Sequence, residues 1–259
     1  MSRSLKFMTF NIRVAAGCDG INMFFNRAHR VIEVIEQEKP DVIGFQEVTD
    51  EMRAWLRDRI PGYTVQGCGR GRDYHGESML LAYRTDDVEM ISLDNLWLSP
   101  TPRVPGSRFT GDQSPCPRML TTVLLKHNAL DTPYRFINTH LDHEGRQARY
   151  LGSMELVQLI STYPERFVLT GDFNATPETP EIKLITEALK DRAPHGAVDC
   201  TAGLGTTFHA FGKLPNGPKI DYIFTDGLCK SSYVVEDIPV NGQYYSDHYA
   251  VVAEIDLED

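Results

Sequence analysis

Acidic, carboxamide and imidazole side chains stand at the ends of several short apolar segments in this chain. One such segment begins at Phe136 and stops on His140, with Asp142 and His143 close behind it. In chain order, the residues placed in this way are Asn11, Glu47, Glu77, His140, Asp172, Asn174, Asp221, Asp247 and His248. A single Asp or Asn at a strand end usually closes a turn, but the recurrence along the chain indicates one shared site.

Oxygen ligands dominate this group, and cysteine is not among its members. Such a set suits a hard divalent cation, Mg²⁺ or Mn²⁺, which keeps several waters and bridges to phosphate oxygens. Hydrolysis of a phosphate ester needs this combination, because a metal neutralises the developing charge, an oriented water attacks in line, and a nearby acid assists the departing oxygen. The sequence therefore predicts a metal-dependent phosphoesterase.

The pattern of apolar residues predicts strands that carry these side chains at their ends. We expect strands over residues 5–12, 41–47, 63–66, 77–84, 88–98, 119–126, 134–141, 167–170, 220–224, 233–236 and 249–255. We expect helices over about 26–38, around 52–56, over 147–161 and over 180–189. The glycine-rich loop 67–76 is expected to face the site, and the long loop 99–117 to carry function as well.

Composition limits the class of protein. At 259 residues, with 41% hydrophobic and 24% charged residues, the chain can form a large core, and we expect one domain over residues 1–259. No stretch is apolar enough for a signal peptide or a membrane span, so we expect a cytoplasmic protein without membrane contact. The five cysteines are scattered without a Cys-x-x-Cys pair, which favours reduced thiols.

The formal net charge of −10 argues against non-specific binding along duplex DNA. The expected partner is a phosphate-ester substrate, either a short nucleic acid or a small molecule. Nothing in the sequence indicates an obligatory protein partner.

Seven short motifs, in this order along the chain, resemble those of the endonuclease/exonuclease/phosphatase superfamily. They are Thr9-Phe10-Asn11, Gln46-Glu47-Val48, Glu77 with Tyr83-Arg84, Asn138-Thr139-His140, Gly171-Asp172-Phe173-Asn174, Ile220-Asp221-Tyr222 and Ser246-Asp247-His248. The resemblance implies a four-layer α/β sandwich, in which two packed, mostly antiparallel mixed sheets are flanked by helices and the site lies at one edge.

The resemblance also implies roles for individual residues. Asn11, Glu47 and Asp247 would form the metal side of the site. Asp172 would orient or deprotonate the attacking water, and Asn174 would hold that water or the phosphate.

Two carboxylate–histidine pairs would clamp the phosphate. Asp221 would hydrogen-bond His248 and favour its charged imidazolium, and Glu77 would do the same for His140. Three further residues would bind substrate, namely Arg118, Asn138 and His75. Arg118 matches an arginine near the scissile phosphate in the pancreatic deoxyribonuclease branch, with a surface ion pair as its alternative reading. The alternative for His75 is an exposed loop histidine, and for Asp142 and His143 a loop cap or a bond behind the site.

Three functions remain open. The form of the Gly-Asp-Phe-Asn and Asn-Thr-His-Leu motifs is closest to a deadenylase-like 3′-5′ exonuclease, so a phosphodiesterase acting on short or single-stranded nucleic acid is the first hypothesis. A phosphoesterase for a sugar, inositol or lipid-headgroup phosphate is the second, favoured by the acidic charge. A catalytically dead binding domain is the third, and the intact motifs argue against it. Phe173 and Phe10 depart from the tyrosyl-DNA phosphodiesterase and abasic-site endonuclease branches.

Overall fold

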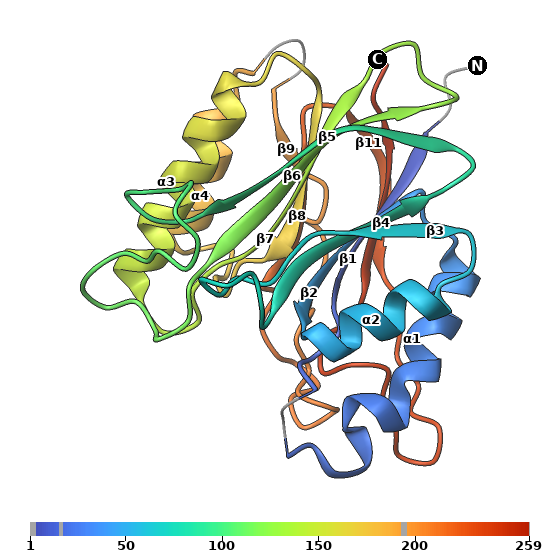
Figure 1. Cartoon of the computed structure of the whole chain (residues 1–259). Helices are drawn as coiled ribbons and strands as arrows, with labels where there is room; N and C mark the ends of the chain where they lie inside the picture. The colour runs from blue at the N-terminus through green and yellow to red at the C-terminus, as the bar shows by residue number, and fades with distance from the viewer. Residues whose placement is uncertain (1–3, 16–17, 193–195, 259) are drawn as a thin grey trace.

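Two six-stranded sheets form the centre of the computed structural model, which describes residues 4–15, 18–192 and 196–258 (Figure 1). The first sheet holds β1 (Leu5–Asn11), β2 (Val42–Val48), β3 (Tyr63–Gln66), β4 (Ser78–Arg84), β11 (Leu228–Val234) and β12 (Val251–Asp256). The second holds β5 (Val88–Trp97), β6 (Met119–His127), β7 (Tyr134–His140), β8 (Phe167–Asp172), β9 (Val198–Asp199) and β10 (Asp221–Thr225). The strand orders are β11-β12-β1-β2-β4-β3 and β5-β6-β7-β8-β10-β9.

Helices cover the outer face of each sheet. The helices α1 (Phe24–Glu38) and α2 (Asp50–Arg59) lie on one side of the molecule, and α3 (Arg146–Thr162) and α4 (Pro180–Leu189) on the other (Figure 1). Between the sheets, Phe7 and Val42 pack with Phe136 and Val168 in one apolar cluster. These layers confirm the predicted four-layer sandwich of two mixed sheets.

Parallel strand pairs bring the predicted site residues to one edge. The strands β1 and β2 are parallel, and so are β7 and β8. Parallel neighbours end at the same edge of a sheet, so the ends of β1 and β2 lie together, as do those of β7 and β8. The register of the second sheet pairs Asp172 with both His140 and Asp221.

Most element boundaries follow the apolar pattern, and the edge strands β3 and β5 were predicted within one residue, whereas β11 and β9 were not. The predicted strand at 233–236 overlaps only the last two residues of β11, which runs from Leu228 to Val234 and contains a register shift between Cys229 and Ser231. Its residues are exposed or half-buried, so the apolar signal there is weak. The two-residue β9 was not predicted.

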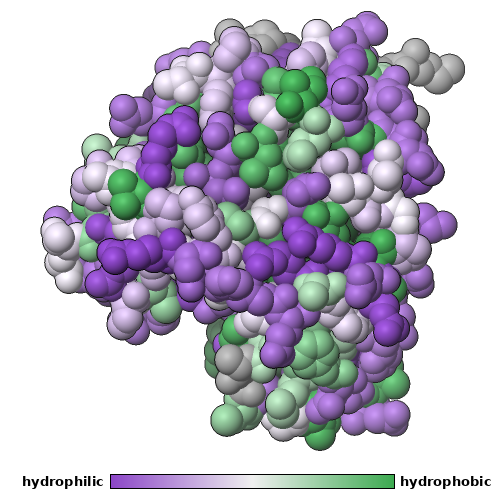
Figure 2. Space-filling model, in the orientation of Figure 1, coloured by the Kyte–Doolittle hydropathy of each residue, from purple (hydrophilic) through white to green (hydrophobic). Residues whose placement is uncertain are grey.

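The surface facing the viewer in Figure 2 is mostly hydrophilic, and its hydrophobic side chains occur in small groups among polar ones. None of the helices in the described ranges is long and apolar enough to cross a membrane.

Candidate active site

A cavity of 370 Å³ opens at the edge where these strands end. Its lining includes Glu47, His140, Asp172, Asn174, Asp247 and His248. The structure therefore brings together residues that lie up to 201 positions apart in the sequence, from Glu47 to His248.

A backbone irregularity places Glu47 in the cavity. The pairing of β2 with β4 shifts register between Phe45 and Val48, and Glu47 has a positive φ of 64°. A bulge of this kind re-aims a side chain at a strand end, and a positive φ outside glycine is characteristic of functional positions.

Hydrogen bonds hold the Glu47 carboxylate as an anion. Its oxygens accept from Asn11 Nδ2 at 3.0 Å and from the backbone N–H of Val14 at 2.8 Å. Burial alone would raise the pKa of Glu47, but the positive charge of His248 and these hydrogen bonds lower it. An ionised carboxylate at this position is a good ligand for a cation.

Asp172 is fixed from two sides. Asn11 Nδ2 donates to Asp172 Oδ2 at 3.0 Å, and the backbone N–H of Asn174 donates to Oδ1 at 2.9 Å. Asn174 adopts a left-handed conformation with φ 47°, which asparagine tolerates better than most residues. Burial and the neighbouring carboxylate of Asp221 raise the pKa of Asp172, so this aspartate is a stronger base than an exposed one.

The predicted contact between Asp221 and His248 is present. His248 Nδ1 donates to Asp221 Oδ2 at 2.9 Å, and His248 Nε2 lies 3.8 Å from Asp172 Oδ2. Burial would lower the pKa of His248, but the surrounding carboxylates, Asp221 first, raise it to about 10. The ring is therefore an imidazolium at neutral pH, with Nε2 facing the cavity residue Asp172.

The predicted contact between Glu77 and His140 is wrong. Glu77 instead accepts a hydrogen bond from Arg70 in the 67–76 loop. His140 Nε2 lies 3.0 Å from its donor Asn174 Nδ2 and 3.5 Å from Asp172 Oδ2. Burial, followed by the charges of Arg118 and Arg70, holds the pKa of His140 well below its usual value, so this histidine is neutral. Of the two predicted carboxylate–histidine pairs, the one between Asp221 and His248 is present and the one between Glu77 and His140 is not.

Arg118 is a buried cavity residue rather than part of a surface ion pair. It is 4% exposed, its Nε lies 3.3 Å from Asp142 Oδ2, and its Nη2 donates to His143 Nδ1 at 2.6 Å. Asp142 also accepts from the backbone N–H of Gly145 at 2.7 Å. Asp142 and His143 therefore hold Arg118, and Asp142 caps the loop as well.

Two predicted substrate-binding residues lie outside the cavity lining. Asn138 is fully buried and donates to the carbonyl oxygens of Phe45 and Leu80, both at 2.8 Å, so it joins the two sheets. His75 is a largely exposed loop histidine whose Nδ1 lies 3.1 Å from Asp50 Oδ2. The geometry gives Asn138 a structural task and assigns His75 no contact with the cavity.

Arg13 is a cavity residue that the strand-end pattern did not reveal. Its guanidinium lies 3.7 Å from Asp247 Oδ2 and 3.9 Å from Glu47 Oε2. It follows the strand that ends on Asn11 by two positions, and its backbone has a positive φ of 54°. Arg70 was missed for a similar reason, because its loop has no periodicity.

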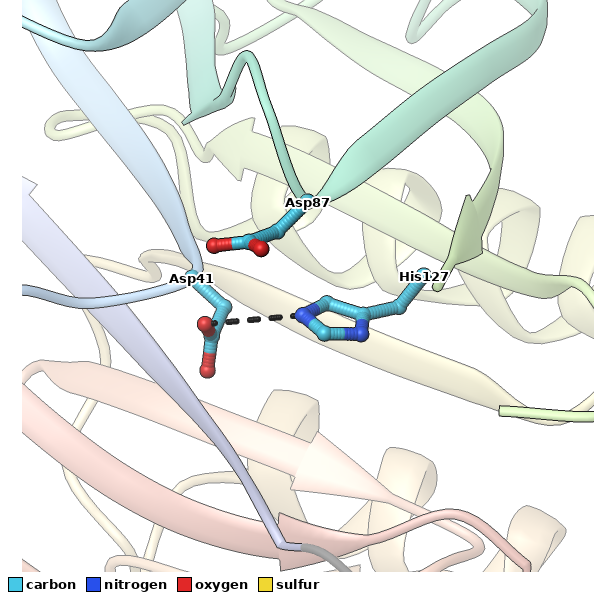
Figure 3. A group of neighbouring side chains, drawn as sticks. All are labelled: Asp41, Asp87 and His127. Atoms are coloured by element: carbon cyan, nitrogen blue, oxygen red, sulfur yellow. Dashed lines mark ion pairs between the residues drawn. The ribbon is translucent and has the colours of Figure 1, made fainter. Parts of the chain in front are cut away.

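A second polar cluster lies away from the cavity. Asp41, Asp87 and His127 converge in Figure 3, where His127 Nε2 and Asp41 Oδ1 are 3.7 Å apart. Asp41 directly precedes β2, whereas Glu47 lies near the end of that strand. This cluster therefore lies at the opposite end of β2 from the cavity.

The donor set at the cavity fits a divalent cation. Carboxylate oxygens of Glu47 and Asp172 lie within 4.8 Å of each other. The ring of His248 lies beside them, but as an imidazolium it does not itself act as a ligand. Asp247 is 6% exposed, and burial, together with the charge of Glu47, raises its pKa. Neighbouring carboxylates that repel one another are stabilised by a cation, and oxygen donors select a hard one.

A two-sheet α/β sandwich with carboxylates, amides and a charged histidine at the strand ends defines a class of metal-dependent phosphoesterases. Residues 8–248 match the model of the Endonuclease/Exonuclease/phosphatase family, and the chain belongs to this family. As predicted, it is therefore a hydrolase acting on phosphate esters, and the family depends on divalent metals.

Solved structures agree with this assignment. The endonuclease/exonuclease/phosphatase from Bacteroides vulgatus is 29% identical, with a TM-score of 0.88 over 98% of this chain and 99% of that one. A mannosyl-6-phosphatase from Bacteroides thetaiotaomicron is 25% identical, with a TM-score of 0.85 over 97% and 99% of the two chains. A sequence relative, an uncharacterized protein of Acanthamoeba polyphaga mimivirus, is 26% identical, and the match covers 88% of this chain and 90% of that protein.

Proposed function

We propose that this chain hydrolyses the phosphate ester of a small molecule with Mg²⁺ or Mn²⁺. The observation that carries the proposal is the convergence of Glu47, Asp172 and His248 at the mouth of one cavity, with Asp221 behind the histidine. Glu47 is held as a carboxylate and His248 as an imidazolium, which suit a cation and a phosphate oxygen respectively.

Asn11, Glu47 and Asp247 would hold the metal. When bound, the metal neutralises negative charge that develops on the phosphoryl group. In the structure Asn11 Oδ1 accepts the backbone N–H of Arg13 at 3.0 Å, while its Nδ2 serves Glu47 and Asp172. Asn11 thus orients two carboxylates of the site.

Asp172 would act as the general base. Its two oxygens are fixed by Asn174 and Asn11, so its position is set before substrate arrives. It takes a proton from water as the water oxygen bonds to phosphorus and the ester P–O bond breaks. The departing oxygen takes up a proton from solvent, and Asp172 returns its own proton to solvent. The products are the free alcohol and phosphate.

His248 and His140 would contact the phosphate in different charge states. The imidazolium of His248 offers a charge-assisted hydrogen bond to a phosphate oxygen. The neutral His140 is held by Asn174 and offers no net charge.

Our choice of substrate class rests on similarity to a known phosphatase and on the net charge of the chain. The sequence hypotheses placed short nucleic acid ahead of small molecules. We reverse that order because a mannosyl-6-phosphatase is similar over almost the whole chain and because the net charge is −10. The cytoplasmic location expected from the sequence stays a prediction.

The experiment is a substrate panel with purified protein. Sugar and inositol phosphates, a short single-stranded RNA and a DNA duplex are incubated with Mg²⁺, with Mn²⁺ or with EDTA. We expect metal-dependent phosphate release from a member of the small-molecule set. Faster turnover of RNA than of every small phosphate would contradict the substrate class, and turnover that persists in EDTA would contradict the mechanism.

A further inference from the structure

Two buried arginines form part of the cavity wall beside His140. Arg70 is 7% exposed and Arg118 is 4% exposed, and both line the cavity. Their charges are, after burial, the largest influences that lower the pKa of His140. Two guanidinium groups therefore lie close to the place where the phosphate must bind.

Each arginine is held by one carboxylate and has further N–H donors that this carboxylate does not engage. Arg70 donates to Glu77 through Nη2, and Arg118 uses Nε and Nη2 for Asp142 and His143. Within the described ranges, Nη1 of Arg70, Nη1 of Arg118 and Nδ1 of His140 are buried and have no hydrogen-bond partner. A buried donor without an acceptor is destabilising, so a ligand oxygen that supplies acceptors here is favoured.

The positive charges of Arg70 and Arg118 repel each other at this wall. Burial lowers the pKa of Arg70, and the neighbouring Arg118 acts in the same direction. Glu77 is the carboxylate that offsets them, and burial raises its own pKa, which favours its neutral form. An anion that enters the cavity relieves the repulsion between the two guanidinium groups.

We propose that Arg70 and Arg118 together bind the peripheral oxygens of a terminal phosphate and make the enzyme selective for phosphomonoesters over phosphodiesters. This inference rests on the proposed function and adds the substrate class. A terminal phosphate has three peripheral oxygens and a charge near −2 at neutral pH, whereas a diester has two and a charge of −1. Guanidinium groups match phosphate oxygens with paired N–H donors.

The burial of the two arginines supports a terminal group as well. Proteins that track a nucleic-acid backbone do so with a basic groove or patch open to the polymer. Here both guanidinium groups are buried in the cavity wall and do not form an open basic groove.

The kinetic test compares p-nitrophenyl phosphate with bis(p-nitrophenyl) phosphate in Mg²⁺. The variants are Arg70→Lys and Arg118→Lys, which keep a cation beside Glu77 or Asp142 and remove the paired N–H donors. We expect kcat/KM for the monoester to fall about tenfold to a hundredfold and that for the diester to change by less than about threefold. Arg72→Lys, an exposed change in the same loop, is the control and should leave both values unchanged.

The binding test uses inorganic phosphate and calorimetry in EDTA, so it does not depend on turnover. We expect the unmodified protein to bind phosphate and Arg70→Lys to bind at least about tenfold more weakly, with the exposed control Arg72→Lys close to the unmodified protein. If a thermal melt shows that Arg70→Lys is not folded, the same comparison is made with Arg118→Lys.

Equal losses on both esters, or phosphate binding unchanged in the variants, would overturn the inference. Phosphate binding that is absent from the unmodified protein would do the same. If phosphate binds through the arginines but no ester is hydrolysed with metal, the proposed function fails and the anion site stands.

Discussion

His248 donates from Nδ1 to the buried carboxylate of Asp221 at 2.9 Å, which leaves Nε2 directed toward Asp172 at 3.8 Å. The two aspartates lie opposite each other in the register of β8 and β10. One pair of neighbouring strands thus supplies both the proposed general base, Asp172, and the carboxylate that holds His248 as an imidazolium. The role of each aspartate follows from what it contacts.

Asp221→Asn should move the alkaline limb of the pH profile. His248 is active as an imidazolium, which is populated below its pKa of about 10 and lost above it. Removing the carboxylate lowers that pKa, so the decline of kcat/KM should begin about one to two pH units earlier. The control Asp87→Asn, in the cluster at the opposite end of β2, should keep the original limb, and an unshifted limb in Asp221→Asn would show that Asp221 does not charge His248.

Asp172→Asn should reduce kcat by about a thousandfold, in the range expected for loss of a general base. Asparagine is similar in size and still accepts the backbone N–H of Asn174, so the fold should survive. Initial rates and a thermal melt on the same sample separate the two effects. Near-normal turnover by a folded variant would remove Asp172 from the mechanism.

Asn138→Ala should lower stability and leave substrate affinity unchanged. The side chain donates to the carbonyl oxygens of Phe45 and Leu80 inside the core, and its loss strands both acceptors and leaves a cavity. We expect a cost of about 2–4 kcal/mol in the free energy of unfolding, measured with urea.

Gly44→Ala provides an independent check on the same contact. A Cβ at Gly44 would lie 2.4 Å from Thr170 Oγ1 and 2.7 Å from Asn138 Oδ1, so it should destabilise the protein as well. A changed KM with unchanged stability in Asn138→Ala would instead restore Asn138 as a substrate-binding residue.

His209 should make the protein less stable in mild acid. It is fully buried, stacks on Tyr249 with ring centroids 4.2 Å apart, and accepts the backbone N–H of Gly212 at Nδ1. Burial, followed by the charge of His248, lowers its pKa to about 4. The unfolded chain binds this proton below about pH 6.5 and the folded one only near pH 4, so stability falls as the pH drops through that window.

The measurement is urea unfolding at pH 7, 5.5 and 4 for the unmodified protein and for His209→Gln. The unmodified protein should lose up to about 3 kcal/mol more than the variant over this range. Parallel curves would mean that His209 does not bind its proton differently in the two states.

The strand ends were predictable from sequence, and the loop contacts were not. The apolar runs that end on His140 and Asp172 gave both strands, and the parallel pairing of β7 with β8 then places the two residues side by side. Glu77 was harder, because its partner was decided by Arg70 in a loop whose sequence has no period. The spacing of apolar residues predicts which polar residues lie at the ends of the strands. It does not predict with which of several neighbouring basic side chains a carboxylate there will pair.

Asn138 shows a different limit. It lies two positions before His140 and therefore on the same face of the strand, which made it a reasonable substrate-binding prediction. Two positions along a strand is about 6.6 Å, and that distance moves the side chain from the edge into the space between the sheets. Depth along a strand depends on how the second sheet packs, which the local sequence does not encode.

Under the proposed function, the divalent cation binds among the cavity carboxylates. Crystals soaked with Mn²⁺ and measured at the manganese absorption edge test it most directly. We predict an anomalous peak within ligand distance of the Glu47 carboxylate, at about 2.0–2.2 Å from its oxygen, and its loss in Glu47→Gln. A peak confined to Asp41, Asp87 and His127, with none beside Glu47, would contradict the account.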